Sequence, residues 1–193
     1  MQEYIKTNIR ESMEAKRQLL EDTSLIESIE QIAALCIAAY QNGNKILVCG
    51  NGGSASDAQH MAGELVGRYQ MERRGLPAIA LTADAAVMTA LANDYQYQNI
   101  FAKQVEALGS KGDILFGIST SGNSENIIQS FQMAKKMYIK TVGLTGHTGG
   151  KLGACADYLL NVPSKHTPRI QEMHILLIHT LCGLIERALA EKR

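Results

Sequence analysis

The sequence of 193 residues contains no tryptophan, few other aromatic residues, only three prolines and no excess of charge of either sign. Its formal net charge is zero, and it has no block of lysine and arginine residues. Proteins that bind nucleic acids usually carry a basic patch, and those that bind single strands also stack the bases on aromatic side chains. We therefore expect no nucleic-acid partner, whereas a small anionic ligand remains allowed because it needs only local charge.

The sequence also lacks cysteine pairs at metal-binding spacing and long apolar segments. Cys36, Cys49, Cys155 and Cys182 stand alone among apolar residues, which predicts small core residues in a reducing compartment. The longest apolar stretch, Ile32–Tyr40, is far shorter than the ~20 residues of a membrane-spanning helix. The first residues are mixed and charged, unlike those of a signal peptide. We expect a soluble, cytoplasmic protein with no membrane partner.

The chain has the length of one domain, and its 46% hydrophobic residues are enough to bury a full core. We predict a single domain over residues 1–193. Residues 1–42 should form two helices, because apolar residues recur at helical spacing before and after residue 22. Residues 45–193 should form an α/β core that ends in a long helix reaching the C-terminus. This last helix is expected to have Thr167 as its N-cap and Pro168 as its first residue.

Short apolar runs alternate with helical stretches through the rest of the chain. The first run, Ile46–Cys49, is apolar throughout, as is typical of a strand covered on both faces. A helical stretch should separate each strand from the next. This alternation predicts a three-layer α/β fold, in which a five-stranded parallel sheet has helices on both faces. The further strands are expected at Ala78–Leu81, Asp113–Ile118, Thr141–Leu144 and Tyr158–Val162.

Two loops rich in glycine and serine follow predicted strands, at 51–54 and 119–124. Ligands bind beyond the carboxyl ends of the strands in an open parallel sheet, where the backbone N–H groups at a helix start attract anions. The second loop adds four hydroxyl groups, and the loops together predict a phosphate site. An ordinary turn with serine caps is the plainer alternative for the second loop. The residues concerned are Asn51, Gly52, Gly53 and Ser54, then Ser119, Thr120, Ser121 and Ser124.

The first loop is also compatible with a dinucleotide site, because Gly50–Ala55 matches the pattern G-x-G-x-x-A directly after a strand. A nicotinamide-dependent oxidoreductase would also need an acidic residue ~20 positions further on, to hold the ribose. Glu72 lies within or just after a helix, and Asp84 comes too late. This hypothesis is therefore much the weaker one. The absence of a Gly-Lys-Ser/Thr ending excludes a nucleotide site of the Walker type.

Polar residues at helical spacing offer nitrogen and oxygen ligands. His60 and Glu64 are four residues apart and lie on one helix face, where they could share a metal or simply a hydrogen bond. Gln171, His174 and His179 occur on the apolar last helix. At ~100° per residue, His179 lies roughly 80° from Gln171 on one side and His174 about 60° on the other. Helix geometry therefore does not choose between the two histidines.

These motifs together resemble the sugar isomerase (SIS) domain family, and most closely its phosphoheptose isomerases. The resemblance extends over nearly the whole chain and implies the flavodoxin-like fold of that family. Any one loop would be shared with many sugar-phosphate binders, whereas the set is specific. The motifs are Cys49–Ser54, His60-x-x-x-Glu64, Gly67-Arg68-Tyr69, Asn93-Asp94, Ser119–Ser124, Leu144-Thr145-Gly146 and Arg169-Ile170-Gln171-Glu172.

The resemblance implies an activity and a quaternary structure. The activity is the conversion of D-sedoheptulose 7-phosphate to D-glycero-D-manno-heptose 7-phosphate, the opening step toward the heptose of bacterial lipopolysaccharide. The family is homotetrameric, with sites at subunit interfaces, and binds one zinc ion per subunit. The implied zinc ligands are His60, Glu64, Gln171 and His179, which leaves His174 a structural or supporting role.

The resemblance also implies the substrate contacts, with the phosphate in the second loop. An enediol mechanism needs a base and an acid, and our candidates are Glu64 as the base and His179 as the acid. The implied contacts are Asn51, Gly52, Gly53, Glu64, Asn93, Asp94, Ser119, Thr120, Ser121, Ser124 and Gln171.

One departure and one rival hypothesis accompany the resemblance. Some members of the family carry an acidic residue at the position of Pro168, so an acid–base role assigned to that residue does not transfer here. A related SIS protein binds the replication initiator DnaA and is not a catalyst. It lacks the equivalents of Glu64 and His179, and because this chain has both, we favour the enzyme.

Overall fold

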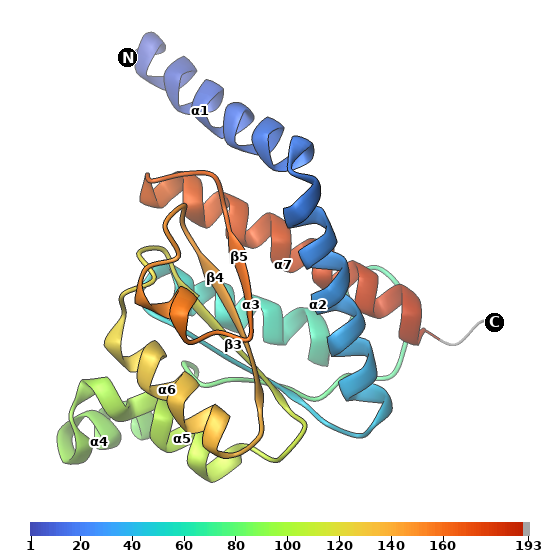
Figure 1. Ribbon diagram of the computed structural model, residues 1–193, viewed down its shortest axis with the longest axis vertical. Helices are drawn as coiled ribbons and strands as arrows, with labels where there is room; N and C mark the ends of the chain where they lie inside the picture. The colour runs from blue at the N-terminus through green and yellow to red at the C-terminus, as the bar shows by residue number, and fades with distance from the viewer. Residues whose placement is uncertain (191–193) are drawn as a thin grey trace.

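The computed structural model describes residues 1–190 and has a parallel five-stranded sheet between two layers of helices (Figure 1). The strand order is β2-β1-β3-β4-β5, which is the flavodoxin-like order. The predicted three-layer α/β fold is confirmed, although the last three residues of the predicted domain lie outside the described part of the chain. The strands are β1 (Ile46–Gly50), β2 (Ala78–Ala80), β3 (Ile114–Ser119), β4 (Lys140–Thr145) and β5 (Tyr158–Asn161).

Both faces of the sheet are buried at its central strands, which explains why β1 is apolar throughout. Side chains of a strand point alternately to opposite faces. Ile46 and Val48 of β1 therefore join one hydrophobic core, whereas Leu47 and Cys49 join the other. An alternating polar pattern would have left one face exposed to water.

Helices cover each face. Helices α2, α3 and α7 pack in the first core, and α4, α5 and α6 cover the opposite face, while α1 projects from the body (Figure 1). No helix within residues 1–190 is long and apolar enough to cross a membrane. The helices are α1 (Gln2–Glu21), α2 (Thr23–Gln41), α3 (Gly53–Val66), α4 (Ala85–Tyr95), α5 (Ile100–Leu108), α6 (Glu125–Lys136) and α7 (Thr167–Leu189).

Apart from shifts of one residue at strand ends, two details differ from the sequence prediction. Thr167 is not an N-cap but the first residue of α7, because the carbonyl group of His166 already accepts a hydrogen bond from the N–H group of Ile170 (2.9 Å) and His166 keeps an extended backbone. The connection between β4 and β5 contains no α-helix and only a short 3₁₀ turn, Lys151–Ala154.

The reversal of strand order places the two glycine- and serine-rich loops next to each other. Gly50 at the end of β1 is paired with Ile118 near the end of β3, so the loops that follow leave the same edge of the sheet. The chain then continues into α3 on one face and into α6 on the other. Ligands of open α/β sheets bind in the crevice that such a reversal creates.

His174 of α7 is fully buried in the first core. Neither ring nitrogen has a hydrogen-bond partner within the described residues. Burial lowers the pKa of His174 to about 4, because the interior disfavours the charged imidazolium. His174 is thus a neutral core residue at physiological pH.

We expect the free energy of unfolding to decrease as the pH falls from 6.5 toward 4, because the unfolded chain then binds a proton on His174 that the folded chain does not. The loss should approach about 3 kcal/mol, since each unit of pKa difference corresponds to about 1.4 kcal/mol. His174→Leu removes this titration. Urea denaturation at several pH values should therefore give a shallower pH dependence for the variant, and identical slopes would contradict this account.

Candidate active site

The loop between β3 and α6 leaves the start of a helix open. Ser124 occupies the N-cap position of α6, yet no side chain in the described structure caps this helix. The Ser124 hydroxyl is instead 2.9 Å from the hydroxyl of Ser119. A turn with a serine cap is therefore not what forms here. The first N–H groups of α6 remain available, and the helix dipole makes them attractive to an anion.

The same loop is held in shape by a close backbone approach. Gly122 has φ +67°, and a Cβ atom there would overlap the carbonyl group of Gly149. The carbonyl oxygen of Gly122 accepts a hydrogen bond from the N–H group of Leu152 (2.8 Å), and Asn123 Oδ1 accepts one from the N–H group of Lys151 (3.1 Å). The loop is thus shaped by the protein itself, before any ligand arrives.

The first loop is tied to the second through Asn51. Its side chain exchanges two hydrogen bonds with Asn126 at the start of α6, both of 2.9 Å, and Asn51 Oδ1 also accepts one from the Tyr97 hydroxyl (2.9 Å). Sequence reasoning missed Asn126 and Tyr97, and no periodic pattern marks either of them. Together these hydrogen bonds fix the position of the first loop relative to the second.

Three of the four predicted metal ligands lie together, between α3 and α7. His60 Nε2 is 3.0 Å from Glu64 Oε1 and 3.2 Å from His179 Nε2. One ligand atom from each residue lies within 4.8 Å of the others, as in a group that could hold a metal ion. Two nitrogen ligands of a tetrahedral zinc, at bonds of about 2.0 Å, would be separated by about 3.3 Å. The spacing and the donor atoms therefore fit zinc.

Gln171, the fourth predicted ligand, lies nearer to the start of α3. Its side-chain amide is so close to Gly53 that a Cβ atom at that position would overlap it. Gln171 precedes His179 by eight residues, which is about 12 Å along a helix. The absence of a side chain at Gly53 thus lets Gln171 reach the first loop.

Two predicted substrate contacts stand apart from this arrangement. Asn93 and Asp94 are exposed on α4, and Asn93 Nδ2 donates a hydrogen bond to Asp94 Oδ1 (2.8 Å). Among residues 1–190, no side-chain hydrogen bond joins either of them to the two loops. Thr120 and Ser121 are placed in the second loop as expected, with Ser121 exposed and Thr120 half-buried.

Tyr69 packs against the possible metal-binding group of His60, Glu64 and His179, here called the metal group or the histidine–glutamate group. The sequence analysis assigned Tyr69 no role. Its ring stacks on that of His179, with centroids 5.5 Å apart and an interplanar angle of 23°. The ring of His60 meets His179 edge-on, with centroids 4.9 Å apart.

A hollow of about 330 Å³ beside these rings is lined by residues that include Tyr69, His179 and Arg187. A larger one, of about 630 Å³, lies between α1 and the start of α7 and contains none of the predicted site residues.

Comparison with known proteins identifies relatives over nearly the whole length. Residues 10–146 match the family model of the SIS domain. The phosphoheptose isomerase of Aneurinibacillus thermoaerophilus is 53% identical over 189 residues, which cover 98% of this chain and 96% of that protein. The phosphoheptose isomerase of Helicobacter pylori strain P12 is 56% identical over 179 residues, or 93% of this chain and 92% of that protein.

Solved structures agree. The phosphoheptose isomerase of Neisseria gonorrhoeae superposes with a TM-score of 0.91 at 46% identity, covering 96% of this chain and 98% of that one. The phosphoheptose isomerase of Francisella tularensis superposes with a TM-score of 0.92 at 42% identity, covering 96% of this chain and 97% of that one. The sugar isomerase domain of the RpiR transcription factor from Sphaerobacter thermophilus gives 0.63 at 17% identity, which shows a shared fold alone.

Gly122→Ala should lower the free energy of unfolding by about 1–3 kcal/mol, because it forces a side chain into a left-handed backbone that already touches Gly149. Gly63→Ala is the matched control. Gly63 is exposed within α3, and a Cβ atom there meets no atom within 4 Å, so alanine should stabilise the helix by about 0.5–1 kcal/mol. Urea denaturation of both variants would test this, and equal effects would contradict a special backbone at Gly122.

Proposed function

The chain belongs to the SIS domain family and, within it, to the phosphoheptose isomerases, and we propose that it converts D-sedoheptulose 7-phosphate into D-glycero-D-manno-heptose 7-phosphate. It is an aldose–ketose isomerase. The observation that carries this proposal is the course of α3. This helix begins at the first glycine-rich loop and carries His60 and Glu64 to a position beside His179 of α7, so that a carboxylate and two imidazoles are grouped between the two helices.

The reaction moves a carbonyl group from C2 to C1. A base removes a proton from C1 of the ketose while O2 gains one, which gives an enediol. An acid then returns a proton to C2 while O1 loses its proton and becomes the new carbonyl oxygen. Negative charge develops on the two oxygens during these steps and must be stabilised. The enzyme therefore needs a base and an acid beside the two carbons, and groups that stabilise charge near their oxygens.

We propose Glu64 as the base and His179 as the acid. One carboxylate oxygen of Glu64 contacts His60, while no hydrogen bond within the described residues engages the other. The second oxygen is thus free to take the proton from C1. Tyr69 keeps the ring of His179 in one orientation by stacking on it, so the proton that His179 delivers comes from a fixed direction.

We propose one zinc ion per subunit, held by His60, Glu64, His179 and Gln171. A zinc-bound carboxylate or imidazole is a poorer base or acid than a free one, so ligation by Glu64 and His179 would loosen during turnover. Zinc bound there would act as a Lewis acid on the substrate oxygens. Support for this ligand set is the close grouping of the first three side chains. The side-chain amide of Gln171 lies against Gly53 of the first loop, a position from which it would also contact the sugar.

The phosphate is proposed to bind at the N-terminus of α6, where the Ser119–Ser124 loop offers hydroxyls and uncapped N–H groups. The sugar would lie between this loop and the histidine–glutamate group. Its proposed contacts are Asn51, Gly52, Gly53, Glu64, Asn93, Asp94, Ser119, Thr120, Ser121, Ser124 and Gln171.

We further propose a cytoplasmic homotetramer of one-domain chains, with sites at subunit interfaces, that supplies heptose for lipopolysaccharide. Support for assembly comes from α1, whose Tyr4, Ile5, Ile9 and Met13 are all more than half exposed. A helix with such a face is rarely left in water. Support for the cytoplasm comes from the cysteines, which are all unpaired.

The two rival hypotheses have less support. The relatives described above carry the name of an isomerase, and none supports a protein that binds DnaA. The dinucleotide hypothesis depends on Gly50–Ala55 alone. The Ser119–Ser124 loop lies next to that segment, and a nicotinamide cofactor would give this second loop no role.

The assay that tests the proposal follows formation of the aldoheptose phosphate from sedoheptulose 7-phosphate, with metal content measured on the same samples. We expect turnover by metal-replete protein, loss after treatment with a chelator, and recovery with zinc. Glu64→Gln should reduce kcat at least about 100-fold, which is the usual contribution of a general base, and His179→Ala should do the same.

Glu106→Gln provides the matched control, since Glu106 is exposed on α5 and, among residues 1–190, forms an ion pair only with Lys103. Its kcat should stay within about twofold of the wild type. Full turnover by a folded Glu64→Gln variant would disprove the base assignment. Binding of the sugar phosphate without turnover would disprove the isomerase.

The assembly proposal predicts that Ile9→Glu combined with Met13→Glu breaks the tetramer, because buried carboxylates without partners are costly. Sedimentation should then change from four chain masses to a smaller species. Thr7→Glu, on another face of α1, should leave the mass unchanged. A smaller wild-type species would refute the tetramer directly.

A further inference from the structure

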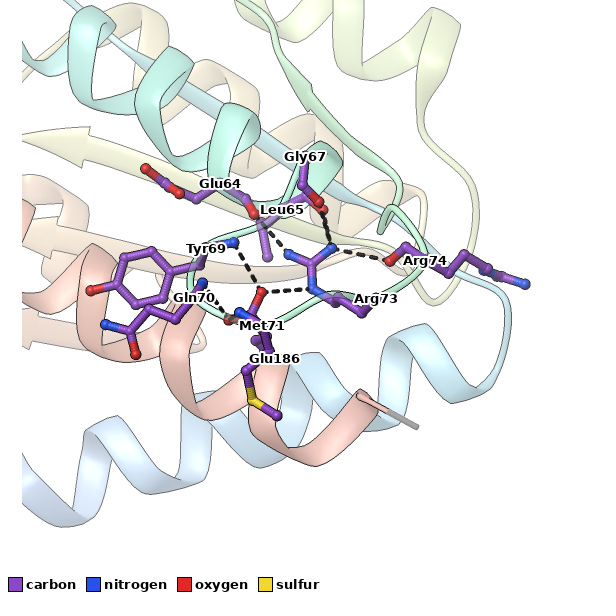
Figure 2. Close-up of polar contacts among 9 residues, drawn as sticks. All are labelled: Glu64, Leu65, Gly67, Tyr69, Gln70, Met71, Arg73, Arg74 and Glu186. Atoms are coloured by element: carbon purple, nitrogen blue, oxygen red, sulfur yellow. Dashed lines mark hydrogen bonds and ion pairs between the residues drawn. The ribbon is translucent and has the colours of Figure 1, made fainter. Parts of the chain in front are cut away.

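A buried ion pair joins the loop after α3 to the last helix (Figure 2). Arg73 Nε lies 3.1 Å from Glu186 Oε1, and the two side chains are only 2% and 1% exposed. The Glu186 carboxylate also accepts hydrogen bonds from three consecutive N–H groups, those of Tyr69 (2.9 Å), Gln70 (2.7 Å) and Met71 (2.9 Å). Burial alone would raise the pKa of Glu186, but these donors and Arg73 outweigh it and lower the pKa, so the carboxylate is ionised.

Arg73 closes the C-terminal end of α3. Its guanidinium donates hydrogen bonds to the carbonyl groups of Glu64 (2.7 Å), Leu65 (2.9 Å) and Gly67 (2.9 Å). The last carbonyl groups of a helix have no partner within the helix and carry partial negative charge, so a cation is favourable there. One of the three belongs to Glu64. Arg73 thus holds the backbone of a residue whose side chain is part of the metal group.

Glu186 reaches the metal group from the other side, through Tyr69. The N–H group of Tyr69 donates to Glu186 Oε1, and the ring of Tyr69 stacks on His179. Glu186 follows His179 by seven residues, about two turns, and therefore lies on the same side of α7. The carboxylate thus fixes the loop residue against which His179 rests.

Stability alone does not account for this pair. Removing two charges from water is expensive, and apolar side chains of similar volume often stabilise a protein as well or better. A charged pair supplies directional bonds instead, and here they fix three segments: the end of α3, the loop 67–74 and α7. These segments carry or support Glu64, Tyr69 and His179.

We propose that Arg73 and Glu186 are positioning residues, which hold α3 and α7 at the separation at which His60, Glu64 and His179 bind a metal ion. This inference rests on the proposed function, in that the metal group serves the isomerase. Neither residue touches the substrate. Their effect is on the geometry and affinity of the metal site.

Glu186→Gln keeps the volume of the side chain and removes its charge. We expect zinc affinity, measured by competition with a chromogenic chelator, to fall 10–100-fold, as is common when a residue that orients metal ligands is changed. The visible spectrum of the full-length protein loaded with Co²⁺ should also change, because it reports the coordination geometry. Both measurements are made without substrate.

Asp113→Asn is the matched control. Asp113 is also 1% exposed, pairs with Lys45 (2.6 Å) and accepts hydrogen bonds from the N–H groups of Lys45 and Ser110. It lies before β3, and its polar partners Asn44, Lys45 and Ser110 belong to neither α3 nor α7. Asp113→Asn should lower the melting temperature as a lost buried ion pair does, and leave zinc affinity and the cobalt spectrum unchanged. Glu186→Gln with the same outcome would overturn the proposal.

Tyr69→Leu tests the same connection if Glu186→Gln fails to fold, since Tyr69 is only half-buried. It removes the ring that supports His179 and should shift the cobalt spectrum. An unchanged spectrum in this variant would also overturn the proposal. Turnover is assayed separately. A wild type that binds metal but does not act on the sugar would refute the proposed reaction, while an altered metal site in Glu186→Gln would still support the positioning role.

Discussion

Helices α3 and α7 lie side by side on one face of the sheet, and their separation sets the distances within the histidine–glutamate group. Two of its members, His60 and Glu64, are on α3, and the third, His179, is on α7. Each helix is also held against the sheet by apolar residues, such as Met61 and Leu177, which are almost completely buried. The hydrophobic core therefore places the helices approximately, and polar contacts at the end of α3 set the finer spacing.

Features that depend on local sequence could be predicted. Buried strands show as apolar runs because both faces of the sheet are covered, and helix starts with glycine and hydroxyl residues mark the loops at its carboxyl edge. Features that depend on distant contacts could not. Asn51 and Asn126 are 75 positions apart, and Tyr69 and Glu186 are 117 apart, so no periodic pattern connects them.

The two histidines of α7 show where periodicity stops being informative. Their angular offsets from Gln171 are similar in size and opposite in direction, yet His174 is in the core and His179 lies beside His60. The two histidines differ in the residues that surround them in the folded chain, which the helix period does not reveal. The same limit applies to the start of α7, where the hydrogen bond to His166 moves the cap by one residue. Fold alone is no better guide to activity, since a transcription factor domain shares it at 17% identity.

The contact between the second loop and the turn after β4 has an evolutionary consequence. A side chain at position 122 would collide with the carbonyl group of Gly149, and one at position 150 would collide with the carbonyl group of Ser121. Both obstacles are main chain, which no substitution elsewhere can shorten. A mutation elsewhere therefore cannot compensate for a larger residue at position 122 or 150. Such a residue would be tolerated only if the backbones of both loops shifted together.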